Sequence, residues 1–69
     1  FYFQRGDLYL HLENYLKSSR EYEQAIRLYE QQGQPNFREL GLTYNNLGFS
    51  YDILGFQNKS KESYYHAFE

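Results

Sequence analysis

The chain repeats itself at an interval of 42 residues, and this repetition limits the folds that it can adopt. When residues 1–27 are aligned with residues 43–69, 8 of the 27 pairs are identical, where composition alone would give roughly two. The identical pairs are Tyr2 and Tyr44, Gly6 and Gly48, Tyr9 and Tyr51, Leu12 and Leu54, Lys17 and Lys59, Ser18 and Ser60, Tyr22 and Tyr64, and Ala25 and Ala67. Such repetition is typical of stacked units that bury their apolar faces against one another. It favours an open binding surface over an enclosed active site.

Composition argues against several classes of protein. The 69 residues make at most one small domain, and with no cysteine the chain holds no disulfide and no thiolate metal site. The net charge is −2 and the lysines and arginines are scattered, which argues against nucleic acid or an anionic membrane as the partner. No apolar run approaches the ~20 residues that span a bilayer. We expect a cytoplasmic protein.

Apolar spacing predicts the helices of the second copy. The clearest stripe recurs at intervals of four and three residues and predicts a helix from about Phe37 to Leu54. Its members are Leu40, Tyr44, Leu47, Tyr51 and Leu54. Gly55 is placed to end this helix in a left-handed cap. Either Asn58 or Ser60 is expected to cap the next helix.

The first copy predicts the same plan. One helix carries Tyr2, Gly6, Tyr9 and Leu12, and the other carries Tyr22, Ala25, Ile26 and Tyr29. A turn near residues 13–14 separates them, and the second helix is expected to end near Gly33. Pro35 then breaks the chain, because proline pushes its predecessor out of the α region. We predict an all-α fold of about four helices in two antiparallel hairpins, with units at residues 1–33 and 34–69.

Two glycines interrupt the predicted helices and indicate how the hairpins close. Gly6 and Gly48 lie in helix interiors, where glycine costs about 1 kcal/mol relative to alanine. A close approach of the partner helix would recover this cost. The residues that would allow it are the small Ser18, Ala25, Ser60 and Ala67, interleaved with Tyr22 and Tyr64.

These residues resemble the tetratricopeptide repeat, whose first helix carries an aromatic residue, Leu-Gly and a tyrosine, and whose second helix carries a small residue, an aromatic residue and an alanine. The second copy matches with Tyr44, Leu47, Gly48, Tyr51, Gly55, Ser60, Tyr64 and Ala67. The first copy matches with Tyr2, Gly6, Tyr9, Tyr15, Ser18, Tyr22 and Ala25. Arg5 stands where the family has leucine. The resemblance implies an α-solenoid segment, and we expect the chain to be a part of a longer array.

The interval of 42 residues exceeds the family norm of about 34 by roughly two helical turns. Long repeats of this kind, with Asn-Asn-Leu-Gly at residues 45–48, are similar to those of kinesin light chains, Pins-type spindle-orientation adaptors and bacterial peptide-pheromone receptors. The resemblance implies a non-catalytic scaffold that binds an extended or helical peptide of a partner protein. Its concave face is lined by the first helix of each repeat.

Nine residues are candidates for this peptide-binding face: Gln4, Asp7, His11, Leu42, Asn45, Asn46, Phe49, Asp52 and Ile53. Side-chain amides can form hydrogen bonds with the peptide backbone, and apolar groups provide pockets for the peptide's side chains. Asn46 is the leading candidate, because in the related long repeats the asparagine before Leu-Gly holds the ligand backbone. Gln4 has the same place in the first copy.

The same residues have simpler explanations. Asn45 and Asn46 are also consistent with solvated helix positions. Phe49 and Ile53 are large apolar groups off the core stripe, and packing against a neighbouring repeat would explain them equally well.

Catalysis, cofactors and metals are not predicted. His11 and Asp7 have helical spacing, but no nucleophile, third metal ligand or phosphate-binding loop accompanies them. The face also lacks the basic residues with which related cochaperone domains clamp a terminal carboxylate, since Arg5 stands at a packing position. Asp7 and Asp52 favour a ligand with a basic side chain.

Two other functions remain open. One is a structural or self-assembly segment that pairs with identical chains, as a homo-oligomer, or with neighbouring repeats through exposed helix faces. The other is the sensor part of a peptide-responsive bacterial regulator.

Overall fold

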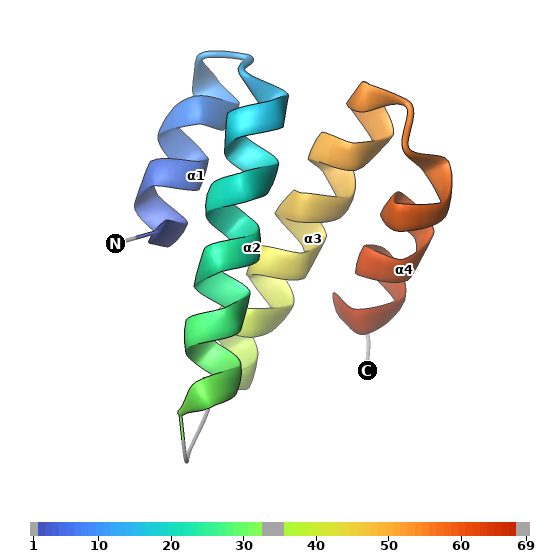
Figure 1. The fold of residues 1–69 in the computed structure, drawn as a ribbon. Coiled ribbons are helices and arrows are strands. Elements are labelled where there is room, and N and C mark those ends of the chain that lie inside the picture. The colour runs from blue at the N-terminus through green and yellow to red at the C-terminus, as the bar shows by residue number, and fades with distance from the viewer. Residues whose placement is uncertain (1, 33–35, 68–69) are drawn as a thin grey trace.

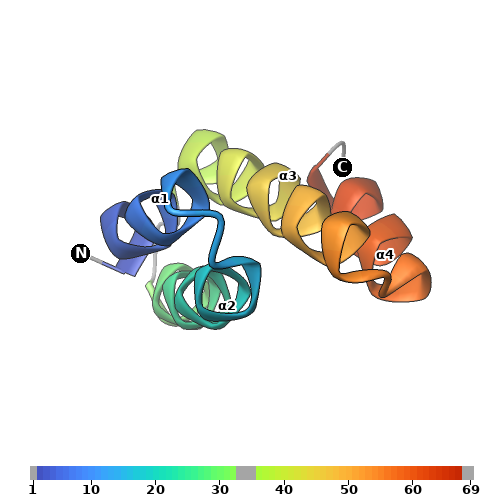
Figure 2. The same ribbon diagram turned by 90° about the horizontal axis from the view of Figure 1, so that it is seen from above.

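The computed structural model describes residues 2–32 and 36–67, and these residues form four α-helices without a strand. The helices are α1 (Tyr2–His11), α2 (Tyr15–Gln31), α3 (Phe37–Leu54) and α4 (Gln57–Ala67). Helices α1 and α2 form one hairpin, α3 and α4 form the other, and α2 packs against α3 to join them (Figure 1). Seen from above, α1 and α3 lie on one side of the molecule and α2 on the other (Figure 2). The predicted all-α arrangement of hairpins is confirmed.

Local signals fix most of the helix ends. Helix α3 has the predicted limits, and Gly55 ends it in the left-handed conformation with φ 86°. At its start the Asn36 side chain accepts a hydrogen bond from the backbone N–H of Glu39, at 3.2 Å. Helix α1 ends at His11, so Leu12 lies in the turn and not on the helix as predicted. The expected break at Gly33 and Pro35 lies outside the described residues.

The predicted cap of α4 is wrong. The helix begins at Gln57, so Asn58 and Ser60 lie inside it. Ser60 is buried, and its hydroxyl donates a hydrogen bond of 3.0 Å to the backbone oxygen of Gly48 on α3. The serine hydroxyl is therefore used between helices and not at a helix end.

The same contact occurs in the first hairpin. There the hydroxyl of Ser18 donates to the backbone oxygen of Gly6, also at 3.0 Å. The two hydrogen bonds join residues that are equivalent under the shift of 42. The sequence repeat is thus a repeat of contacts as well as of residues.

The two helix glycines lie where their partner helices come close, as predicted. A Cβ atom placed on Gly6 would lie 2.6 Å from ring atoms of Tyr22, and one on Gly48 would lie 3.0 Å from ring atoms of Tyr64. Cβ atoms essentially never come closer than 3.0 Å to another heavy atom. The glycines therefore provide the space into which the tyrosine rings pack.

The core lies where α2 meets α3. Its buried members are Tyr22, Ile26, Leu47 and Tyr51, with Phe3, Leu40 and Tyr44 packed against them. Of the tyrosines, Tyr22 and Tyr51 are buried, whereas Tyr65 is exposed. The hydroxyl of Tyr51 donates to Glu23 on α2 at 2.7 Å. Burial is the main cause that raises the pKa of Tyr51 above its ordinary value, and the carboxylate of Glu23 raises it further.

Candidate functional site

The side of α3 that faces away from the core carries six of the nine predicted residues. We call this surface the α3 face, and it consists of Leu42, Asn45, Asn46, Phe49, Asp52 and Ile53. Helical spacing places these residues within about a third of the helix circumference, opposite Leu47 and Tyr51. Leu42, Phe49 and Ile53 remain 49%, 44% and 51% exposed. Large apolar groups are therefore presented to solvent along one side of a single helix.

The predicted residues of α1 divide into two kinds. Gln4 and His11 are exposed, whereas Asp7 is half-buried. One carboxylate oxygen of Asp7 accepts a hydrogen bond from the hydroxyl of Tyr22 on α2 and another, of 3.4 Å, from the side-chain amide of Asn46 on α3. Asp7 thus ties three helices together, and sequence analysis missed this role.

The contact of Asp7 has an electrostatic consequence at Tyr22. Burial is the main cause that raises the pKa of Tyr22, and the hydrogen bond and charge of Asp7 raise it further. Hydrogen bonds with Ser18 and Asn46 act in the opposite direction. The sequence did contain a signal for the contact between Asp7 and Tyr22. Gly6 allows the Tyr22 ring to pack against α1, and Asp7 directly follows Gly6.

Asn46 is held in place on both its main chain and its side chain. Its side-chain amide donates to Asp7, and its backbone oxygen accepts a hydrogen bond of 3.2 Å from the hydroxyl of Ser50. The hydroxyl of Ser50 also lies 3.4 Å from that of Ser18 on α2. Asn46 is therefore half-buried at the junction of α1 and α3, and a fully solvated position does not describe it.

Phe49 combines packing with exposure. Its ring meets the ring of Tyr15, the first residue of α2, edge to face at 6.3 Å between centroids. Asn45 and Asp52 are exposed on either side of it. The pKa of Tyr64 on α4 is raised mainly by burial and, to a smaller extent, by the negative charge of Asp52. The α3 face thus extends from the α1 side to the α4 side of the helix.

A hollow of about 470 Å³ opens beside the first turns of α3. We call it the Arg38 hollow, and it is lined by Phe37, Arg38, Gly41, Leu42, Asn45 and Ala67. Leu42 and Asn45 belong to the predicted residues, but Arg38 was missed. The signal for Arg38 was its spacing, since it precedes Leu42 by four residues and so shares the side of α3 on which Leu42 lies.

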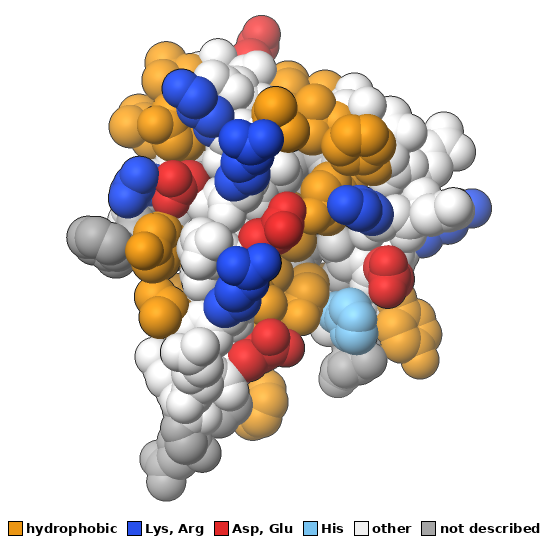
Figure 3. Space-filling model, in the orientation of Figure 1, with side chains coloured by type: hydrophobic (Ala, Val, Ile, Leu, Met, Phe, Trp, Pro, Cys, Tyr) orange, Lys and Arg blue, Asp and Glu red, His pale blue; other side chains and the backbone are white. Residues whose placement is uncertain are grey.

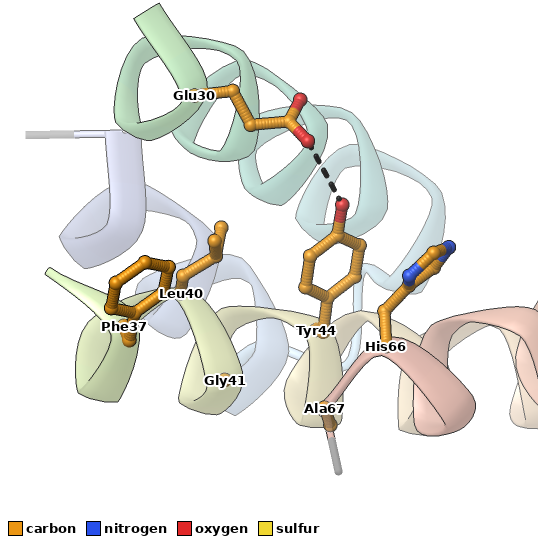
Figure 4. A pocket seen from close by; sticks show the side chains of 7 residues that line it. All are labelled: Glu30, Phe37, Leu40, Gly41, Tyr44, His66 and Ala67. Carbon is orange, nitrogen blue, oxygen red and sulfur yellow. Dashed lines mark hydrogen bonds between the residues drawn. The ribbon is translucent and has the colours of Figure 1, made fainter. Parts of the chain in front are cut away.

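A second hollow, of about 410 Å³, lies between α2, α3 and α4. We call it the Tyr44 hollow, and Figure 4 shows its lining residues, which are Glu30, Phe37, Leu40, Gly41, Tyr44, His66 and Ala67. Its carboxylate, from Glu30, points to the Tyr44 hydroxyl at 3.5 Å, and the rings of Tyr44 and His66 lie 5.0 Å apart. Sequence analysis missed this hollow because the helical stripe assigned Leu40 and Tyr44 to the core.

The described residues bear on three other kinds of site: a nucleic-acid surface, a metal site and a membrane span. On the face drawn in Figure 3, the described Lys and Arg side chains are interspersed with Asp and Glu, whereas nucleic acid is bound by continuous basic surfaces. Within residues 2–32 and 36–67, no group of three or more His, Cys, Asp or Glu side chains is arranged to hold a metal ion. Over the same residues, no helix has the length and apolar character that a membrane span requires.

Comparison with known proteins assigns the first hairpin. Residues 1–32 match the family model of the tetratricopeptide repeat. No curated protein and no solved structure gives a significant match to the chain. The second hairpin repeats the serine-to-glycine hydrogen bond and the glycine-to-tyrosine contact of the first. The match supports a tetratricopeptide repeat over residues 1–32, and repeats of this family generally mediate interactions between proteins.

Proposed function

We propose that the chain is a non-catalytic scaffold that binds an extended or helical peptide of a partner protein along the α3 face and the adjoining side of α1. The observation that carries the proposal is the exposure of three large apolar side chains, Leu42, Phe49 and Ile53, on one side of α3. Exposed apolar side chains that are grouped in this way often mark an interaction surface, whereas single scattered ones are normal on any protein surface.

The length of the apolar stripe suits a short peptide. Leu42 and Ile53 are 11 residues apart, which corresponds to about 16 Å along a helix. An extended peptide covers this distance with about five residues, and a helical one covers it with about three turns. The exposed amide of Asn45 lies within the stripe and supplies both a donor and an acceptor for the peptide main chain.

Asn46 supports the proposal through its fixed position. Its bond to Asp7 uses one amide hydrogen, which leaves the amide group with further hydrogen-bonding capacity. A side chain that is already held in place loses less conformational entropy on binding than a mobile one. We assign Asn46 to the peptide backbone on these grounds.

The test compares two leucines of equal exposure. Peptides selected against the chain from a random 12-residue library are titrated against Leu42→Ala and Leu16→Ala, because Leu42 and Leu16 are 49% and 47% exposed on different helices. We expect Leu42→Ala to weaken binding about tenfold and Leu16→Ala to leave it within twofold, with helicity unchanged in circular dichroism. Equal effects of the two substitutions would contradict the proposed surface.

Self-assembly is a second candidate, and one observation favours it. Leu8, Leu12 and Leu16 are exposed close to the turn between α1 and α2. Hydrophobic side chains are visible at this corner in the upper left of Figure 3. Sedimentation velocity over a hundredfold range of concentration tests this function. A mass that rises with concentration and returns to that of the monomer in the Leu12→Ser variant would support it, and a constant monomer would exclude it.

A further inference from the structure

We propose that the Arg38 hollow binds an acidic side chain of the partner segment, through the guanidinium of Arg38 and the amide of Asn45, with an apolar neighbour of that side chain against Leu42. This inference rests on the proposed function and specifies the chemistry of its ligand. It gives the peptide a defined charge at one end of the α3 face.

Arg38 has no partner of its own within the described residues. No hydrogen bond, ion pair or ring contact involves its side chain there. The residues three and four positions away are the uncharged Gln34, Pro35, Gly41 and Leu42, so its helix offers no ion pair. Arg5 is different, because its guanidinium lies 3.0 Å from the carboxylate of Glu21. As far as the described residues go, the guanidinium of Arg38 is thus available for a ligand.

The lining of the hollow matches an acidic residue beside an apolar one. Arg38, Leu42 and Asn45 follow at intervals of four and three residues, so they form one stripe over about two turns of α3. A guanidinium binds a carboxylate through two parallel hydrogen bonds, and a neighbouring amide N–H adds a third. Phe37, which is largely exposed, and Leu42 supply the apolar wall. Among the described residues that line the hollow, none is an Asp or a Glu.

The charges along α3 give the site a direction. Asp52 lies 14 residues beyond Arg38 on the same side of the helix, which corresponds to about 21 Å. A carboxylate of the partner is attracted at the Arg38 end and repelled at the Asp52 end. The adjacent Tyr44 hollow contains Glu30 and offers no comparable site for an anion.

The experiment uses the 69-residue chain and two pools of fluorescein-labelled seven-residue peptides with blocked ends. One pool has Leu-Glu at its centre and the other has Leu-Gln, and all other positions are drawn from the same uncharged residues. We expect the Leu-Glu pool to bind about tenfold more tightly at low salt. In Arg38→Gln this preference is expected to fall below twofold. Arg27→Gln, which removes the same charge from an exposed position of α2, is expected to retain it.

Three results would overturn the inference. The first is equal affinity for the two pools, and the second is an equal loss of preference in Arg38→Gln and Arg27→Gln, which would indicate a general charge effect. The third is the lack of binding of either pool at millimolar concentration. If both pools bind equally and both depend on Leu42, the peptide-binding face is retained and only the acidic specificity is lost. Independence from Leu42 would instead contradict the proposed function.

Discussion

The two hairpins have the same contacts between their own two helices, but they differ in the exposure of equivalent positions on their first helices. Each has a serine that donates to a helix glycine and a tyrosine that packs on the same glycine. At the position before that glycine they diverge, because Leu47 is 4% exposed on α3, whereas the side chain of Arg5 on α1 is 50% exposed and paired with Glu21. The inner contacts are set by each hairpin alone. The outer positions depend on which helix covers them.

Helix α2 provides that cover for α3. It packs along the side of α3 that carries Leu47 and Ser50, and Ser50 is fully buried there. In the described part of the chain no helix packs on the corresponding side of α1, and Leu8, the equivalent of Ser50, is exposed. A position in a helical repeat therefore has a fixed place on its own helix, but its burial is decided by the helix pair that precedes it.

Exchanging the two divergent residues would test this difference most severely. We expect Leu47→Arg to lower the free energy of unfolding by about 3 kcal/mol or more, because it places an unpaired charge at a buried position. Arg5→Leu removes an ion pair whose arginine side chain is 50% exposed and whose Glu21 side chain is 16% exposed, and it should lower the free energy by only about 1 kcal/mol. Urea denaturation of the two variants measures both values. Similar losses would show that the outer side of α1 is covered as well as that of α3.

The two glycines should differ by less, and here the first hairpin is expected to be the more sensitive one. In Gly6→Ala the new methyl group meets the ring of the fully buried Tyr22, and we expect a loss of about 2 kcal/mol. In Gly48→Ala it meets the half-buried Tyr64 at a slightly greater distance, and the gain in helix propensity offsets much of the cost. A loss of about 1 kcal/mol or less is expected for this variant. Denaturant midpoints with unchanged slopes would give the comparison, and a larger effect at Gly48 would contradict it.

A gradual loss of stability is expected in alkaline solution. The fold raises the pKa of Tyr22 and Tyr51 above the ordinary value of 10.0, so it opposes formation of the charged phenolates. Their contribution is complete below pH 10 and is lost as the pH rises above it towards the raised values, by about 1.4 kcal/mol per pH unit for each tyrosine. Denaturation between pH 8 and pH 11, in steps, measures this slope. Tyr22→Phe and Tyr51→Phe should each make it shallower, and the unaltered slope would refute the assignment.

Sequence analysis predicted what depends on local signals. The limits of α3, its cap at Gly55 and the glycine contacts of Gly6 and Gly48 all follow from spacing and backbone preference, and the structure confirms them. The cap of α4 was predicted wrongly because a serine near a helix start has two uses. At Ser60 the neighbouring helix takes the hydroxyl.

The candidate site was less predictable, because it depends on contacts between helices. The junction of Asp7, Tyr22 and Asn46 joins residues up to 39 positions apart. Gly6 gave a signal for the Asp7 and Tyr22 part alone, and no local pattern encodes the contact with Asn46. Arg38 was missed because the family pattern starts at Tyr44, whereas α3 begins two turns earlier. The peptide-binding role of the α3 face itself stays a prediction.

The most direct test of that role maps the bound peptide on the chain. Nitrogen-15 NMR spectra are recorded while a peptide selected from the random 12-residue library is added to the 69-residue chain. We predict that the largest amide shifts cluster at Asn45, Phe49 and Ile53, with the Asn46 side-chain amide among them. Shifts confined to α2 and α4 would place the binding surface on the opposite side of the molecule and contradict the account.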